Sequence, residues 1–236
     1  MTPQYRLLQQ IARVFPDAIF YKPTLMRAVA LTIDDVPTPQ EPGDASTQQI
    51  LAAIADYNQQ LGPLDYPVRA TFFIISSHLN DAGEILQQMQ QQGHEIANHG
   101  AVDDLAAALA PDLFHHHIQT AHHRITTFAD RPLRWYRPGR GLYTPSMLQV
   151  LRQMEGYEPR FALASMIPFD TFRFANDPPF TAWYVTQFVF PGAILVLHGG
   201  SAERASNTAR VLKNLLPALA QQGYQVVTLS QLWDLV

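Results

Sequence analysis

The sequence predicts a single α/β domain whose parallel strands form the core of an incomplete or distorted barrel of seven β/α units. Short apolar runs alternate with longer stretches of helical spacing, which is typical of a parallel sheet covered by helices. A length of 236 residues suits one such domain. Seven units are one short of a closed eight-fold barrel, so an open barrel is favoured, with a doubly wound sheet as the alternative.

Seven runs rich in Val, Ile, Phe or Tyr are predicted to be strands. In chain order they are Arg27–Ile33, Arg69–Ile75, His94–Ala97, Arg134–Tyr136, Arg160–Ala164, Ala193–Leu197 and Tyr224–Leu229. Most of these runs end on polar residues. The third and fourth runs are the shortest.

The stretches between the runs have helical spacing, and glycines near their ends act as stop signals. The predicted helices are Thr47–Gln60, Ala82–Gln92, Leu105–Ala129, Pro145–Met154 and Asn207–Gln222. Residues 1–26 are interpreted as a helical extension and residues 27–236 as the domain itself. The Pro-rich segment Thr38–Gly43 is expected to be a loop over the site, and Phe169–Pro191 a longer excursion between strands.

Composition excludes several classes of protein. The net charge is −4 and the basic residues are dispersed, so neither nucleic acid nor an anionic membrane is an expected partner. Without cysteine, any metal must be held by His, Asp or Glu. Neither a secretory signal nor a membrane-spanning run is apparent, so a cytoplasmic location is expected, although a mature secreted form would look the same. The oligomeric state is not indicated.

Unusual polar residues recur where the predicted strands end. Because catalytic groups of parallel α/β folds come from the carboxyl ends of strands, these residues are expected to share one face of the barrel. They are Asp34 and Asp35, His99, Arg137, Ser165, Asp170 and His198.

Two features of this set indicate a metal. The adjacent carboxylates of Asp34 and Asp35 would repel each other unless a cation or a shared proton relieves them, although a turn or helix cap is an equal alternative. His99 and Asp103 are four residues apart, so a helical turn would place both on one face. Asp35, His99 and Asp103 would then form a set suited to Zn²⁺, and also to iron, cobalt or manganese. The competing interpretation of His99 and Asp103 is a solvated pair.

At this point the sequence resembles the polysaccharide deacetylase family. The matching segments are LTIDDVP, ATFFI, GHEIANH, RWYRPGRG, ILVLHGG and the closing LLPALAQQGYQVVTLSQL, in the family's order and spacing. The resemblance covers residues 27 to 232. It implies a catalytic domain that removes acetyl groups from an N-acetylated sugar or polysaccharide by hydrolysing an amide bond.

The resemblance also implies a role for each matching residue. Asp34 would be the general base, Arg137 the partner that orients it and His198 the general acid, whereas Asp35 and His99 would hold the metal. Asp170 matches an acidic residue of the fourth motif, and Asp103 stands where a second metal-binding His is usual. The residues expected to contact the substrate are Pro138, Gly139, Arg140 and Leu197.

The sequence departs from the family in several places, which leaves other functions open. Besides Asp103, these are Val36 in the first motif, Gly100 in the second and the segment RPGRG in the third. A hydrolase of a small non-sugar amide is the second hypothesis. A non-catalytic carbohydrate-binding relative is the third, and the presence of both Asp34 and His198 argues against it.

Other residues have a structural interpretation as their stronger alternative. The His tract 115–117 and 122–123 is expected to lie on a solvated helix face, because consecutive helical residues point in different directions. His94 opens its strand at the end away from the site, and His78 follows the second strand on the site side. Three aromatic residues could line a sugar groove, but more often such residues belong to the core: Trp183, Tyr184 and Phe188.

Overall fold

Strand β2 (Ala28–Val36) lies at the centre of the sheet in the computed structural model, which describes residues 3–80, 83–167 and 177–235. It pairs in parallel with β3 (Thr71–Ile74), β6 (Ile194–His198) and β7 (Gln225–Val227). Strand β4 (Glu95–Asn98) extends the sheet beyond β3, also in parallel. All strands of this sheet therefore direct their carboxyl ends to the same side.

The rest of the barrel wall is held by shorter contacts. Strand β5 (Phe161–Ala162) pairs with β1 (Ala18–Ile19), and single bridges join Asn98 to Tyr136 and Met166 to Leu195. The first bridge joins β4 to the 134–136 segment, and the second joins the residues that follow β5 to β6. The expected distorted, seven-unit α/β barrel is thereby confirmed as a single domain with a parallel core.

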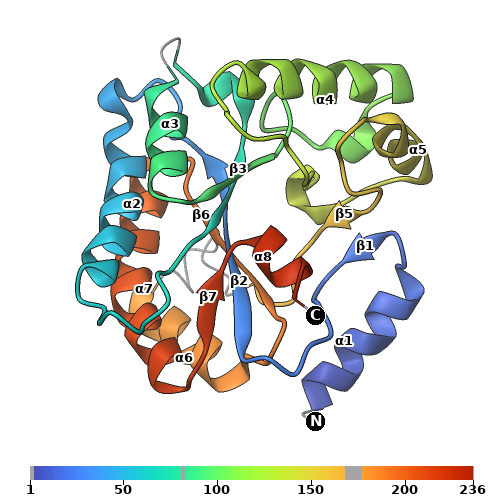
Figure 1. The fold of residues 1–236 in the computed structure, drawn as a ribbon. Coiled ribbons are helices and arrows are strands. Elements are labelled where there is room, and N and C mark those ends of the chain that lie inside the picture. Colours follow the sequence, from blue (N-terminus) through green and yellow to red (C-terminus); the bar gives the residue numbers. More distant parts are fainter. Residues whose placement is uncertain (1–2, 81–82, 168–176, 236) are drawn as a thin grey trace.

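Helices surround the strands (Figure 1). The α-helices are α1 (Pro3–Val14), α2 (Ala45–Asn58), α3 (Glu84–Gln91), α4 (Pro111–Thr126), α5 (Pro145–Gln153), α6 (Pro178–Phe188), α7 (Ala202–Gln221) and α8 (Leu229–Trp233). Short 3₁₀ turns occur at Pro42–Asp44, Ser76–His78, Ala106–Ala108 and Gly139–Gly141. In the described chain, no helix is long and apolar enough to cross a membrane.

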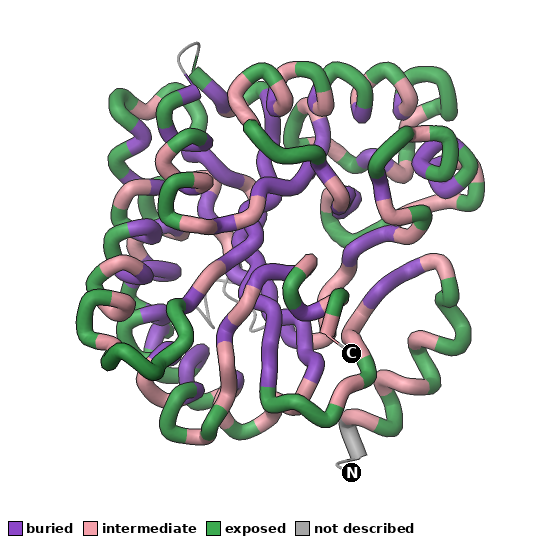
Figure 2. Tube along the Cα trace, in the orientation of Figure 1, coloured by how far each residue is buried: buried purple, intermediate pink, exposed green. Residues whose placement is uncertain are grey.

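Alternation along β2 decides which side chains face the site. Val29, Leu31 and Ile33 pack in the large core cluster beneath the helices, whereas Ala28 and Ala30 belong to a smaller cluster inside the barrel. Because strand side chains alternate, Thr32 and Asp34 follow on the inner side. The purple strands at the centre of Figure 2 show how completely this core is buried.

Several predicted elements differ from the observed ones. The 134–136 run is not a strand and forms a single bridge, because Pro132 and Pro138 restrict its backbone on both sides. Helix α4 begins at Pro111, which lacks the N–H that a helix interior needs, rather than at Leu105. Helix α6 lies inside the predicted excursion 169–191, and β1 lies within the predicted extension 1–26.

Candidate active site

The carboxyl ends of the strands meet at a cavity of about 530 Å³. The register of β2 and β6 places Asp34 opposite His198, and His99 directly follows β4. The predicted residues that line this cavity are Asp34, Asp35, His99, Asp103, Arg137, Pro138, Gly139, Arg140 and His198. Residues that are far apart in the sequence are therefore assembled at one end of the barrel.

Asp34 forms a buried ion pair with Arg137. One guanidinium nitrogen of Arg137 lies 2.5 Å from Asp34 Oδ1 and 2.8 Å from the Thr32 hydroxyl. The guanidinium also donates to the carbonyl oxygens of Ala162 and Leu163, at 2.7 and 3.2 Å. Since all of these partners accept hydrogen bonds from it, the guanidinium is fixed in place and holds the Asp34 side chain in one orientation.

Asp35 adopts an unusual backbone conformation at the end of the site strand. Its φ angle of 65° lies in the left-handed region, which costs a non-glycine residue free energy unless its surroundings hold it there. His78 Nδ1 donates to the Asp35 and Pro37 carbonyls, at 3.2 and 2.9 Å. This contact gives His78 a structural role, and the residue does not line the cavity.

His99 lies between both carboxylates and a backbone acceptor. Its Nε2 is 3.2 Å from Asp35 Oδ1 and 3.9 Å from Asp34 Oδ2. Its Nδ1 donates to the Arg137 carbonyl at 2.8 Å, which fixes the tautomer of the neutral ring with its lone pair on Nε2. A lone pair facing two carboxylates is repulsive, so this position calls for a cation, either a proton or a metal ion.

The charged residues of the site shift one another's pKa values. Burial alone would raise the pKa of Asp35, but the hydrogen bond from His99 and the charges of His99, His198 and Arg204 lower it to about 2. Burial alone would lower the pKa of His99, but Asp34 and Asp35 raise it. The site therefore holds Asp35 ionised and attracts positive charge to His99.

Arg204 is a site residue that the sequence analysis missed. It lies near the start of α7 and one of its terminal nitrogens is 3.3 Å from Asp35 Oδ2, so the two oxygens of Asp35 face different cations. A basic residue six positions after His198, at the beginning of a helix that leaves the site, could have been the signal. Phe20, Ile167 and Val196 also line the cavity without having been expected.

Asp103 lines the cavity but does not join Asp35 and His99. Residues 101–104 form bends rather than the helical turn expected between His99 and Asp103. The Asn98 side chain accepts from Gly100 N at 2.7 Å, and Gly100 has a φ of 103°, so the chain turns away instead of starting a helix. Among the described residues, no group of three or more His, Asp or Glu side chains could hold a metal ion.

A divalent metal nevertheless fits Asp35 and His99 as ligands. The two donor atoms converge, the backbone acceptor fixes the imidazole, and the paired carboxylates supply negative charge. Further positions would be left to water, to substrate or to Asp103.

The remaining predicted residues are placed as follows. Leu197 is fully buried in the core and does not line the cavity, whereas its neighbour His198 does. Asp170 lies outside the described residues. Tyr184 and Phe188 line a separate apolar cavity beside α1, so the structure does not place them in the catalytic cavity.

The His tract on α4 lies at the surface of the helix, as expected. His116 and His123 are exposed, and His117 Nδ1 lies 3.5 Å from Asp104 Oδ2. His122 meets the hydroxyl of Tyr157 at 3.0 Å. These contacts differ from one His to the next, as expected for consecutive residues of a helix.

Residues 21–158 match the family model for polysaccharide deacetylase. The chain belongs to the polysaccharide deacetylase family. The resemblance seen in the motifs is thereby confirmed, as is the expectation of a hydrolase acting on carbon–nitrogen bonds.

Two curated deacetylases are similar to almost the whole chain. A chitooligosaccharide deacetylase from a Bradyrhizobium species is 28% identical over 221 residues, which is 87% of this chain and 90% of the relative. A peptidoglycan-N-acetylglucosamine deacetylase from Bacillus cereus is 26% identical over 211 residues, covering 89% of this chain and 90% of the relative.

Solved structures share the fold. The Bc1960 peptidoglycan N-acetylglucosamine deacetylase has a TM-score of 0.78 at 21% identity, covering 97% of each chain. A family 4 acetyl xylan esterase from Clostridium thermocellum, in complex with a cobalt ion, has a TM-score of 0.73 at 26% identity, covering 87% of this chain and 90% of that one. A CE4 family pseudoenzyme from Bacillus anthracis has a TM-score of 0.76 at 20% identity, covering 93% and 69%.

Proposed function

We propose that this protein is a metal-dependent deacetylase that hydrolyses the acetamide of an N-acetylated sugar or a short oligosaccharide. One observation carries the proposal: the buried Asp34–Arg137 ion pair lies beside the Asp35–His99 pair at the wall of an open cavity. The similarity to chitooligosaccharide and peptidoglycan deacetylases supports the sugar substrate. The cavity volume of about 530 Å³ suits one to a few sugar units better than a fully enclosed polymer.

Asp35 and His99 would hold the divalent metal, with Zn²⁺ favoured by the N,O donor set and Co²⁺, Mn²⁺ or Fe²⁺ as alternatives. When bound, the metal supplies Lewis-acid polarisation of the acetyl carbonyl and of a water molecule. The proposed third ligand is Asp103, which lines the same cavity and would have to move toward Asp35 and His99 to complete the set.

Asp34 would accept a proton from the attacking water as the new bond to the acetyl carbon forms. Arg137 keeps Asp34 oriented, since its guanidinium is fixed by three further acceptors. His198, opposite Asp34 in the register of β2 and β6, would give a proton to the departing amine. Thr208 donates to the His198 carbonyl at 2.6 Å, which fixes the backbone that carries this acid.

An assay on N,N′-diacetylchitobiose tests this proposal directly. Acetate release is expected from the purified protein, loss after chelation, and recovery with Zn²⁺ or Co²⁺. Asp34→Asn and His198→Ala are each expected to lower kcat by about 10²- to 10⁴-fold. Arg152→Gln, at an exposed pair with Asp17, is the control that should keep full activity.

The two alternatives give different outcomes in the same assay. Turnover of a small non-sugar amide, with none of the sugar substrate, would support the second hypothesis and reject the sugar. A protein that binds the chitobiose but releases no acetate at any metal concentration would be the non-catalytic relative, and the proposal would be wrong.

A further inference from the structure

Basic residues mark the beginnings of the barrel strands, at the end opposite the catalytic cavity. Arg27, His94 and Arg160 directly precede β2, β4 and β5, Arg69 stands shortly before β3, and Arg134 opens the 134–136 segment. The proposed mechanism uses none of them. Their partners decide whether they are structural or available to a ligand.

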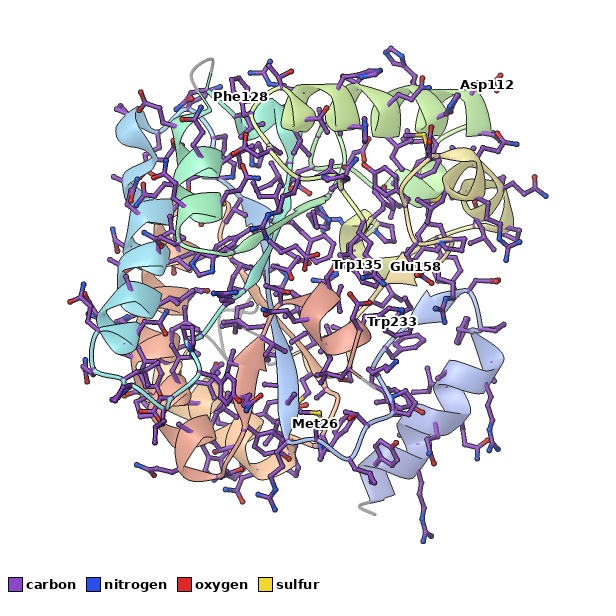
Figure 3. All side chains as sticks on the ribbon, in the orientation of Figure 1. Met26, Asp112, Phe128, Trp135, Glu158 and Trp233 are labelled. Carbon is purple, nitrogen blue, oxygen red and sulfur yellow. The ribbon has the colours of Figure 1, made fainter. Side chains whose placement is uncertain are left out.

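Three of these residues have structural partners. Arg27 donates to a carbonyl at the end of α7 at 2.6 Å, where a cation offsets the helix dipole. Arg160 pairs with Glu158 at 2.5 Å, and Arg134 pairs with Asp234 at 2.9 Å. Arg134 and Arg160 also lie over the rings of Trp135 and Trp233, respectively. Trp233 is the last residue of α8, and both Trp residues are labelled in Figure 3.

The other basic residues line a second cavity of about 530 Å³, to which Arg131 contributes from a loop. Within the described ranges, neither Arg69 nor Arg131 has a carboxylate at ion-pair distance. Arg134 lines the same cavity. Three arginines therefore line one hollow, and among the residues that the structure describes only Arg134 has a carboxylate partner.

His94 adds a directed donor to this hollow. The residue is 2% exposed, and its Nδ1 accepts from Ala70 N at 3.2 Å, so the ring hydrogen is on Nε2. The part of the chain that the structure describes offers no acceptor for this N–H, although His94 lines the cavity. Burial and the charge of Arg69 lower the pKa of His94 to about 4, so at neutral pH the ring is uncharged and donates through Nε2 alone.

Glu95 is the carboxylate of this cavity, and its oxygens are already satisfied. They accept from Thr71 Oγ1 at 2.6 Å, Trp135 Nε1 at 3.1 Å and Ser230 N at 3.1 Å. The Ser230 hydroxyl donates to it as well. Because these partners are neutral donors, Glu95 is anchored within the wall but keeps its negative charge. The cavity still has an excess of positive charge, because Arg69 and Arg131 together outweigh this one carboxylate.

We propose that this basal cavity, defined by Arg69, His94, Arg131 and Arg134, binds a small phosphate ester. Guanidinium groups match the oxygens of a phosphate as forked donors, and the imidazole N–H offers a further donor of fixed direction. The volume accepts a sugar phosphate in addition to the anion itself. The site lies at the opposite end of the barrel from Asp34, so it does not depend on the proposed deacetylase activity.

Titration calorimetry on the full chain tests the basal cavity, with glucose 6-phosphate, inorganic phosphate and glucose as probes at constant ionic strength. Both phosphates are expected to bind saturably and glucose is not. An Arg69→Gln, Arg131→Gln double variant should weaken binding by about tenfold or more, because hydrogen bonds to charged groups are lost. Arg152→Gln, whose exposed partner is Asp17, should bind as the unchanged protein does.

Three results would overturn the proposal. They are no saturable heat with either phosphate, equal affinity in the double variant, or loss of affinity with Arg140→Gln, which would place the ligand in the catalytic cavity. If the double variant does not fold, as judged by circular dichroism, the single Arg131→Gln variant carries the test because that side chain is exposed.

Discussion

Arg137 does more than the sequence motif implies. The motif predicts a partner that orients Asp34, but the guanidinium also donates to Thr32 and to the carbonyls of Ala162 and Leu163 at the end of β5, and it lies 4.0 Å from the centre of the Phe73 ring. It thus joins the end of β2 to the wall opposite. These contacts could not be predicted, because they depend on atoms of separate segments that only the fold brings together.

Replacing Arg137 should affect stability as well as activity. Arg137→Met leaves the Asp34 carboxylate buried without its cation, and the loss of one member of a buried pair costs about 3 to 5 kcal/mol. Urea unfolding measures this cost. The double variant with Asp34→Asn should recover part of it, and a single Arg137→Met variant that unfolds at the same urea concentration as the parent would contradict the expectation.

His94 makes stability depend on pH in a defined range. Its pKa is about 4 in the folded chain and about 6.5 when exposed, so between these values the unfolded chain binds more protons. The contribution of His94 is fully present above pH 6.5 and is lost as the pH falls toward 4, by about 3 kcal/mol in total. Urea midpoints at pH 7 and pH 5 should therefore differ less in His94→Gln than in the parent, and equal differences would refute this assignment.

At the scale of elements, two sequence features predicted most of the strands and helices that position the site. They are the alternation of apolar runs with stretches of helical spacing, and the polar residues where the apolar runs end. Short apolar runs predicted the strands β2, β3, β6 and β7, and the stretches between the runs predicted helices. The ends of these runs also predicted the positions of Asp34 and His198. The errors arose where local pattern is weak. Residues 101–104 turn because of an Asn98 contact to Gly100 N, and β1 is two residues long, too short for any periodicity.

The short strand β1 gives the amino-terminal segment two different roles. Helix α1 contacts the domain through Tyr5, whose ring meets Tyr21 and Phe190 at 5.4 and 5.1 Å. By contrast, Ile19 is buried and accepts from Leu163 N at 2.8 Å, within the β1–β5 pair. The predicted boundary at residue 26 therefore assigns β1, which is part of the barrel wall, to the extension and not to the domain.

Two truncations should behave differently for this reason. Removal of residues 1–16 is expected to leave a folded protein, whereas removal of residues 1–24 also strips β1 and should cost about 4 kcal/mol more, from buried apolar surface and several hydrogen bonds. Thermal unfolding of both truncated chains measures the difference. Equal stability of the two would mean that β1 does not support the wall.

At the scale of the whole molecule, the barrel separates two kinds of charge arrangement. The carboxyl ends of the strands carry paired carboxylates with Arg137, Arg204 and His99, and the amino ends carry a series of basic residues. Sequence alone indicated the first arrangement apart from Arg204, because conspicuous residues followed the strands. The second was overlooked because Arg at the start of a strand is common and its importance depends on which of these residues lack partners.

Metal binding should stabilise the whole domain. At a free metal concentration about 100-fold above the dissociation constant, the proposed Zn²⁺ would add about 2.7 kcal/mol, which corresponds to a rise in Tm of roughly 5 to 10 °C. Scanning calorimetry of the chelator-treated protein with and without Zn²⁺ measures this rise. Asp35→Asn should abolish it, and an undiminished rise in that variant would place the metal elsewhere.

Strand β2 pairs with three other strands, and this pairing affects which parts of the protein can change during evolution. A strand paired with β3, β6 and β7 exposes its amides only when the whole core opens, so hydrogen exchange at Leu31 to Ile33 should be among the slowest in the chain. Asp34 and Asp35 continue directly from that protected segment, whereas Arg140 lies on an exposed turn at the rim. Evolution can therefore alter which acylated molecule enters the cavity by exchanging rim residues, while the reacting groups stay anchored to the most persistent part of the fold.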